Sequence, residues 1–160
     1  MVLTYTGVKM NKSHLTAIPR KKPSLPLRVL VNSGKINLDA KILDFGCGRG
    51  KDYTWLSSMG YNARGYDPHW NRDEEALKNK YDVVLCSYVL NVVDKTTQKQ
   101  ILDQLKSLTK TNGKIYVSVR RDLKEDYVSS KGTQQYLVKL PYTIFKETSD
   151  YCIYEIEEQG

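Results

Sequence analysis

The chain has 160 residues, of which 40% are apolar, and it carries 25 Lys and Arg against 18 Asp and Glu. This size and composition predict one globular domain, and they exclude both a multidomain assembly and a disordered chain. No apolar run approaches the roughly 20 residues that span a bilayer, and the first residues lack the apolar core of a signal peptide. We therefore expect a cytoplasmic protein that does not enter the membrane.

The residues that most often bind metals are few and scattered. Cys47, Cys86 and Cys152 form no C-x-x-C pair, and only His14 and His69 can supplement them. We expect neither a disulfide framework nor a metal site.

The positive charge is concentrated at the amino end. Residues 1–38 contain no acid, and the seven bases among them are Lys9, Lys12, Arg20, Lys21, Lys22, Arg28 and Lys35. The rest of the chain is balanced, with 18 bases and 18 acids. Such segregation suits a polyanion such as DNA or RNA, whereas a merely solvated arm is the alternative. We expect a basic arm and helix over 1–38, followed by one domain over 39–160.

The predicted elements begin with a short helix, for which Ser24 is the cap, Pro26 lies in the first turn and Gly34 is the stop. Beyond it strands and helices alternate. Strands are expected over 41–45, 61–67, 81–89, 114–119, 135–140 and 151–156. Helices are expected over 52–59 and from Asp94 to the break at Asn112-Gly113. This alternation predicts parallel pairing with helices on both faces, while the last two strands, joined by a turn at 148–150, can return antiparallel.

A glycine-rich turn follows the first strand. It reads DFGCGRG over 44–50, and Asp67 stands 17 residues after Gly50, at the end of the next strand. Glycines allow a sharp turn and a close approach to a ligand, while a carboxylate at that strand end can accept both hydroxyls of a ribose. A dinucleotide site needs its third glycine at position 51, where Lys51 stands, so that alternative is weakened.

The DFGCGRG segment resembles the first motif of class I S-adenosylmethionine-dependent methyltransferases. Three further segments resemble later motifs in the expected order: GYDP (65–68) for the ribose, 81–94 for the methyl-transfer site, and 111–119 for the next turn and strand. The resemblance implies a Rossmann-like α/β fold with a mostly parallel sheet, and S-adenosylmethionine as cofactor. The implied cofactor-binding residues are Arg20, Asp44, Gly46, Cys47, Gly48, Gly50, Asp67, Pro68, Ser87 and Tyr88.

The chain is also similar to compact bacterial and bacteriophage methyltransferases, including those associated with DNA phosphorothioation genes. The stretches that carry this likeness are HLTAIPRKKPSLPLRVL, DPHW, YVLNVVD, VRRD and GTQQYLVKLP, within residues 14–156. This closer likeness implies a fold and a cofactor but no acceptor.

One departure from the family pattern changes the expected sheet. Only thirteen residues separate Asp67 from Tyr81, too few for the usual helix, third strand and second helix. We expect the third strand to be reduced or missing, which leaves six strands in the family order 2-1-4-5-7-6 with an antiparallel C-terminal strand. The adenine wall must then come from Pro68, His69, Trp70 or side chains near Asp73.

No acceptor motif is complete. Amino-methylating DNA enzymes have D/N/S-P-P-Y/F/W after the fourth strand, where this chain has CSYV (86–89). The DPHW segment imitates that motif, but at the second strand, where Asp67 is needed for the ribose. The Pro-Cys pair of cytosine-C5 enzymes is absent too, so Cys47 and Cys86 are expected to be packing residues.

Candidate acceptor-side residues follow from their place at the carboxyl ends of the strands, where ligands collect in open α/β sheets. Arg120 and Arg121 can clamp a phosphate there, and Tyr88 or Tyr127 can stack a base. The alternative is a surface salt-bridge group with Asp122 and two half-buried tyrosines. The catalytic candidates are Tyr88, Arg120, Arg121 and Gln134.

The leading interpretation is an S-adenosylmethionine-dependent methyltransferase that acts by direct transfer on nucleic acid or a nucleotide-like acceptor. A small-molecule methyltransferase and a non-catalytic cofactor-binding regulatory module are the alternatives. In the arm, Arg20 or Lys21 can cover the cofactor as a lid, which is compatible with a nucleic-acid contact. The sequence does not define an oligomeric state.

Overall fold

The computed structural model describes residues 22–159. The predictions for His14, Arg20 and Lys21 fall outside the described residues. The helical elements are α1 (Leu25–Asn32), α2 (Lys51–Ser58), η3 (Glu74–Lys78), η4 (Leu90–Val92) and α3 (Lys95–Ser107). The strands are β1 (Lys41–Phe45), β2 (Asn62–Tyr66), β3 (Tyr81–Ser87), β4 (Thr109–Arg120), β5 (Tyr127–Val128), β6 (Gln134–Gln135), β7 (Thr143–Glu147) and β8 (Tyr151–Glu157).

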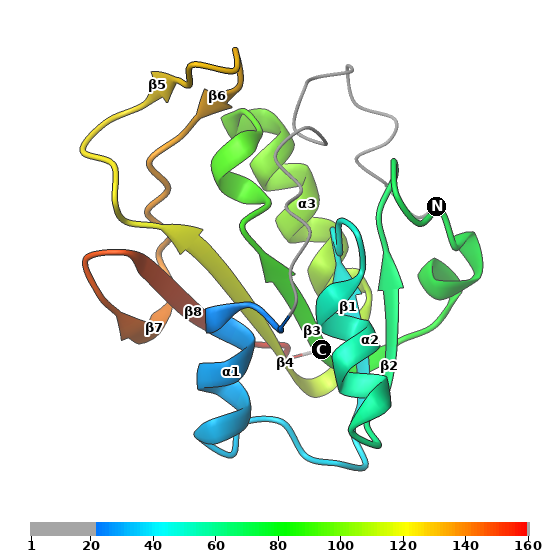
Figure 1. Cartoon of the computed structure of the whole chain (residues 1–160). Helices are drawn as coiled ribbons and strands as arrows, with labels where there is room; N and C mark the ends of the chain where they lie inside the picture. The colour runs from blue at the N-terminus through cyan, green and yellow to red at the C-terminus, as the bar shows by residue number, and fades with distance from the viewer. Residues whose placement is uncertain (1–21, 160) are drawn as a thin grey trace.

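Six strands form one mostly parallel sheet in the order β2-β1-β3-β4-β8-β7 (Figure 1). Strand β1 pairs in parallel with β2 and β3, and β3 pairs in parallel with β4. The C-terminal strand β8 is antiparallel to both of its neighbours, β4 and β7. The predicted α/β fold, its antiparallel C-terminal strand and its strand order are therefore confirmed. Only the short η3 lies between β2 and β3, so the missing third strand is confirmed as well.

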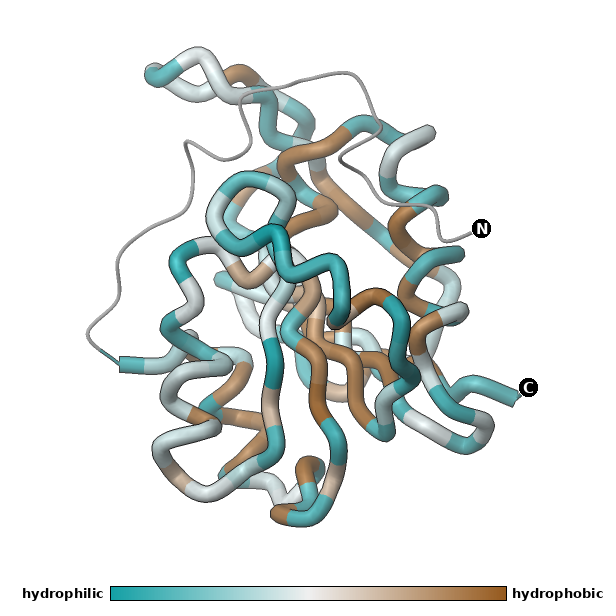
Figure 2. Tube along the Cα trace, turned by 90° about the vertical axis from the view of Figure 1, so that its right-hand side faces the viewer, coloured by the Kyte–Doolittle hydropathy of each residue, from teal (hydrophilic) through white to brown (hydrophobic). Residues whose placement is uncertain are grey.

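Two apolar cores lie on the two faces of this sheet. Helices α1 and α2 cover one face, in front of the sheet in Figure 1, where Leu27, Leu30 and Leu56 pack with Ile42 and Leu85. Helix α3 covers the other face and packs there through side chains such as Ile101 and Leu105. Figure 2 shows the apolar strands running between these layers. Strands β1 and β3 are buried on both faces, and the alternation of side-chain direction along each strand sets which residues face α1 and α2 and which face α3.

The expected strand over 135–140 is wrong beyond its first residue. The backbone N–H groups of this segment bond to groups outside any ladder: Tyr136 N to Asn91 O, Leu137 N to Asp126 Oδ1, and Leu140 N to Tyr154 Oη. Val138 is buried all the same, and Tyr136 and Leu140 are partly buried, because the segment packs on the apolar core beneath α3. Strand β7 takes the edge position that was expected for this segment.

The expected helix stop at Asn112-Gly113 is also misplaced. Helix α3 ends at Ser107, and residues 109–120 form one strand. Asn112 adopts φ 67° there, a left-handed conformation that asparagine tolerates. Its N–H bonds to Glu158 O, so the signal marks an irregularity inside β4.

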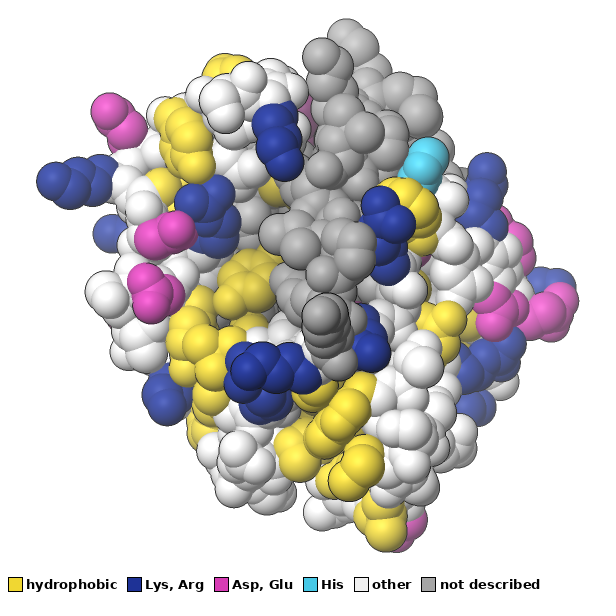
Figure 3. All heavy atoms as spheres, viewed as in Figure 1, with side chains coloured by type: hydrophobic (Ala, Val, Ile, Leu, Met, Phe, Trp, Pro, Cys, Tyr) yellow, Lys and Arg dark blue, Asp and Glu magenta, His cyan; other side chains and the backbone are white. Residues whose placement is uncertain are grey.

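A buried contact between Ser24 and Asp52 joins the two helices of the front face. Ser24 caps α1, its Oγ accepting from Leu27 N, and also donates its own N–H and O–H to the Asp52 carboxylate over 2.7 and 2.6 Å. Both residues are almost fully buried, and Asp52 lies in the first turn of α2. Apolar side chains gather between these helices on the face seen in Figure 3. The contact therefore attaches the start of the described chain beside the glycine-rich loop.

We expect Asp52→Asn to lower the free energy of unfolding by about 2 kcal/mol, since one Ser24 donor then faces an amide group instead of a charged acceptor. Urea denaturation measures the change. The exposed Asp39 provides the matched control, because Asp39→Asn should change stability by less than about 0.5 kcal/mol. Equal stability of the two variants would contradict the role given to this contact.

Candidate functional site

The glycine-rich loop turns the chain sharply between β1 and α2. Gly46, Gly48 and Gly50 have φ values of 77°, 56° and 83°. Only glycine adopts this left-handed region without steric cost, which explains the spacing of the three glycines in the sequence. The loop lies at the carboxyl edge of the parallel strands, where open α/β sheets bind ligands.

Most N–H groups of the loop are used inside the protein. Gly46 N and Cys47 N both donate to Tyr66 O, over 2.7 and 3.0 Å, and Gly50 N donates to Cys47 O. Gly48 N donates to Asp67 Oδ2 over 2.9 Å. A pyrophosphate site needs free N–H groups aimed at the ligand. The geometry therefore disfavours the dinucleotide alternative and suits a ligand that lies against the glycine backbone.

Asp67 holds the end of β2 and the loop together. Its Oδ1 accepts from His69 N and Trp70 N over 2.9 and 3.0 Å, while its Oδ2 accepts from Gly48 N. A pair of backbone hydrogen bonds with Asn71 closes the turn that follows. Two carboxylate oxygens offer about four acceptor positions, so three are already used. We expected Asp67 to accept both ribose hydroxyls, whereas the present arrangement leaves a position for one.

Asp44 and Asp67 make the loop region electrically negative. Both carboxylates are buried, with 3% and 7% of their surface exposed. Burial raises the pKa of the Cys47 thiol well above its usual range, and the charges of Asp44 and then Asp67 raise it further. Burial and Asp44 raise the pKa of the Cys86 thiol in the same way. Both thiols stay protonated at neutral pH, which suits packing and disfavours nucleophilic attack.

The aromatic ring of Tyr53 fills the space beside two glycines. A Cβ at Gly65 would collide with the Tyr53 ring, and one at Gly50 would lie 2.6 Å from its Cε1. Asn71 Nδ2 donates to Gly65 O and, over 3.3 Å, to the Tyr53 hydroxyl. Sequence reasoning missed Tyr53 and Asn71. The available signal was Gly65, because a glycine inside a strand often marks a close approach of another group.

An aromatic and basic cluster borders the other side of the loop. The Arg49 guanidinium lies 4.2 Å from the centre of the Trp70 ring, and His69 meets Trp70 edge to face at 4.9 Å. Trp70 is 38% exposed, and Pro68 is half-buried in the same turn. The structure thus groups the residues named for the adenine wall, and it adds Arg49, which the sequence did not suggest. Their contact with adenine stays a prediction.

Strand β3 ends in a strained turn at the carboxyl edge. Ser87 is its last residue, and Tyr88 adopts φ 61°, which is rare for an aromatic residue and costs about 1–3 kcal/mol. Tyr88 N donates to Ser118 O over 2.8 Å, and its side chain packs partly against the α1 core. The geometry brings both residues to the predicted edge. Their roles stay predictions.

The two arginines that follow β4 do not form one clamp. Arg120 pairs with Asp122 and donates to the Tyr127 hydroxyl over 3.1 Å. Arg121 is 10% exposed and binds Glu147, Val138 O and the Tyr154 hydroxyl.

Arg120 and Arg121 are thus engaged as in the salt-bridge alternative. Gln134 lies on β6, where its Nε2 donates to Tyr127 O. A catalytic role for these three residues stays a prediction, and Arg20 lies outside the described residues.

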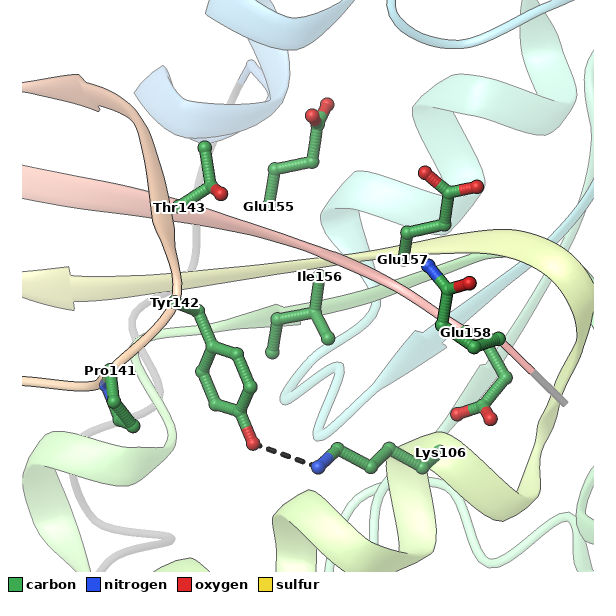
Figure 4. A pocket seen from close by; sticks show the side chains of 9 residues that line it. Lys106, Pro141, Tyr142, Thr143, Glu155, Ile156, Glu157 and Glu158 are labelled. Carbon is green, nitrogen blue, oxygen red and sulfur yellow. Dashed lines mark hydrogen bonds between the residues drawn. The ribbon is translucent and has the colours of Figure 1, made fainter.

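A separate shallow pocket of about 520 Å³ lies at the opposite end of the sheet (Figure 4). Lys106 donates to the Tyr142 hydroxyl there over 2.8 Å. The side chains of Glu155 and Glu157 point to one side of β8 and that of Ile156 to the other, so the lining does not converge on a point.

In the described part of the chain, no group of three or more His, Cys, Asp or Glu side chains is arranged to hold a metal ion. None of the helices within 22–159 has the length and apolar character to span a membrane.

Comparisons with known proteins agree with this geometry. A family profile described as a methyltransferase domain matches residues 19–147. The structure is similar to 1,6-didemethyltoxoflavin-N1-methyltransferase from Burkholderia thailandensis, solved with 1,6-didemethyltoxoflavin and S-adenosylhomocysteine, with a TM-score of 0.66, 13% identity, and coverage of 85% of this chain and 78% of the other. Magnesium protoporphyrin IX methyltransferase from Synechocystis PCC 6803, solved with S-adenosylhomocysteine, gives a TM-score of 0.57, 18% identity, and coverage of 83% and 80%. At these identities the likeness establishes the fold. No curated protein matches the chain in sequence.

The raised pKa of Cys47 predicts slow alkylation. At pH 8 we expect iodoacetamide to modify Cys47 about tenfold or more slowly than glutathione, because little thiolate forms. Mass spectrometry of the modified peptide follows the reaction, with Cys47→Ser as the blank. Labelling of Cys47 as fast as that of glutathione would show that burial and the two carboxylates do not keep this thiol protonated.

Proposed function

The chain belongs to the methyltransferase-domain family, and on that premise we propose that it transfers the methyl group of S-adenosylmethionine to a small planar acceptor. The supporting observation is a glycine-rich loop flanked by two buried carboxylates, with most of its N–H groups used internally. This site favours a cationic nucleoside and disfavours a phosphate-bearing one. When bound, S-adenosylmethionine supplies a methyl group that is already electrophilic, because it is carried on a sulfonium.

Different residues around the loop bind different parts of this cofactor. Asp44, buried at the end of β1, is the partner for the ammonium group of the methionine half. The remaining acceptor position of Asp67 takes one ribose hydroxyl, and the turn with Pro68 and Trp70 lies next to the adenine. Ser87 and Tyr88, at the end of β3, lie on the side from which the acceptor approaches. Holding the two reactants in line can supply much of the rate acceleration.

A small acceptor is favoured by the size of the elements available to recognise it. Within residues 22–159, the carboxyl edge carries only the segment 121–140 with its β5–β6 hairpin beyond the sheet, its helices and their short connections. The structurally similar enzymes named above are methyltransferases of 1,6-didemethyltoxoflavin and of magnesium protoporphyrin IX, both planar ring systems.

A nucleic-acid acceptor is the second candidate. The observation in its favour is the basic segment 1–38, with seven bases and no acid. Membership of the compact bacterial and bacteriophage group, including members associated with DNA phosphorothioation genes, is a separate proposal, which implies a fold and a cofactor but no acceptor.

The cofactor assignment predicts that Asp44→Asn weakens binding of S-adenosylhomocysteine about tenfold or more, the equivalent of about 1.4 kcal/mol, because the charge facing the ammonium group is lost. Isothermal titration calorimetry measures the affinity. Asp103→Asn, at an exposed site on α3, is the matched control and should bind as tightly as the parent chain. Undiminished affinity in Asp44→Asn would remove Asp44 from the site, and no binding by the parent chain would refute the proposed function.

The choice of acceptor class predicts weak contact with nucleic acid. In 50 mM salt, duplex and single-stranded DNA and RNA should bind with dissociation constants of micromolar or weaker, and replacing Lys9, Lys12 and Lys22 by Gln should leave methyl transfer to small acceptors unchanged. Fluorescence anisotropy over a salt series measures the binding. Tight binding with a steep salt slope that the substitutions abolish would instead favour the nucleic-acid candidate.

A further inference from the structure

The short helix η4 carries a buried amide whose carbonyl has no partner. Asn91 lies four residues after the end of β3 and is 2% exposed. Its Nδ2 donates to Gln135 Oε1 over 3.3 Å, but its Oδ1 has no hydrogen-bond partner. Leaving a buried acceptor unpaired is costly, and such a group in a native protein calls for an explanation.

The surroundings of Asn91 place it on the acceptor side of the site. The turn at Tyr88 directs the chain from the carboxyl end of β3 into η4, next to the strand that leads into the glycine-rich loop. Asn91 O accepts from Tyr136 N over 2.7 Å, so both its backbone and its side chain contact the segment around β6. Figure 1 shows the β5–β6 hairpin standing at this edge of the sheet.

The hairpin covers Asn91 with its inner strand and exposes its outer strand. Its strands have two residues each, and Tyr127 and Val128 on β5 are 39% and 62% exposed, whereas Gln135 on β6 is 5% exposed. The side-chain bond from Asn91 to Gln135 is long, at 3.3 Å, and the exposed outer strand gives the hairpin few buried contacts of its own. Breaking that bond as the Gln135 side chain moves aside is the direct way to expose the Asn91 amide to a ligand.

We propose that Asn91 Oδ1 accepts a hydrogen bond from the acceptor's own nucleophilic group, which is an N–H or O–H. The proposal rests on the methyltransferase function above and narrows its substrate class to amines and hydroxyl compounds. An amide oxygen accepts a hydrogen bond but does not take the proton, so Asn91 aims a lone pair of the nucleophile at the methyl group. In the transfer the C–S bond breaks as the N–C or O–C bond forms, the sulfonium becomes a thioether, and the acceptor's proton passes to water.

The test uses pairs of probes that differ in this donor. Aniline and phenol have an N–H or O–H, whereas N,N-dimethylaniline and anisole lack it at nearly the same shape. Each is titrated into the full chain saturated with S-adenosylhomocysteine, and amide chemical shifts report the affinity. We expect aniline and phenol to bind the parent chain at least fivefold more tightly than their methylated counterparts.

Two variants separate the Oδ1 from the amide pair as a whole. Asn91→Leu removes the Asn91 Oδ1 together with the Asn91–Gln135 hydrogen bond. Gln135→Leu breaks the same hydrogen bond but leaves the Asn91 Oδ1 in place. The preference for aniline and phenol should disappear in Asn91→Leu and persist in Gln135→Leu. Should Asn91→Leu fail to fold, Asn91→Ala serves in its place.

Any of four results would overturn the proposal. The parent chain binds neither aniline nor phenol, or it binds them no more tightly than their methylated counterparts. The preference survives in the Asn91 variant, or it is lost in both variants, which would show that the amide pair only holds the hairpin. Binding of S-adenosylhomocysteine to the parent chain is measured first, so failure of the proposed function is distinguished from failure of this inference.

Discussion

The attachment of the glycine-rich loop to the end of β2 is the constraint on which the rest of the site depends. Three glycines with positive φ values give the loop a shape that few other residues can adopt, but the same residues would leave it flexible if nothing held them. Tyr66 O and the Asp67 carboxylate supply that hold by accepting the N–H groups of residues 46–48. Hydrogen bonds within the protein therefore already fix the Asp67 carboxylate in position. A ligand that bonds to Asp67 needs no further ordering of this group.

The same arrangement sets the charge of the site. Asp44 and Asp67 are both buried, and their charges add to the effect of burial in raising the pKa of the Cys47 thiol. The guanidinium of Arg49, at the border of the loop, stacks on the Trp70 ring. A negative interior bordered by a stacked guanidinium selects a cationic ligand with an aromatic base over an anionic one.

Local signals account for what the sequence predicted well. The glycine spacing, the short interval before Tyr81 and the apolar runs of β1 and β3 each report on a few neighbouring residues, whereas the strand order is implied by the resemblance to class I methyltransferases. The segment 135–140 misled because its apolar side chains are buried as in a strand, while its N–H groups bond to Asp126, Tyr154 and η4. The real edge strand β7 is mostly exposed, so it lacks a burial pattern and is held by its pairing with β8. Gly65 is the one signal in the sequence that points toward Tyr53 and Asn71, whereas the role of Asp52 comes from its contact with Ser24, 28 residues away, and has no local signal.

Because the third strand is missing, few residues of the described chain remain to recognise the acceptor. In a direct methyl transfer the protein must mainly align two reactants, and a single well-placed hydrogen bond can fix the orientation of the nucleophile. Here the carboxyl edge offers Tyr88, η4 and the hairpin for that purpose, while Arg120 and Arg121 are bound to Asp122 and Glu147. The guanidinium groups of Arg120 and Arg121 are thus already paired with carboxylates. The side-chain groups that remain near β3 are neutral amides and hydroxyls. Under the proposed function, these groups orient an acceptor that is planar and uncharged and that carries an N–H or O–H. The chemistry of the acceptor is then restricted more strictly than its size.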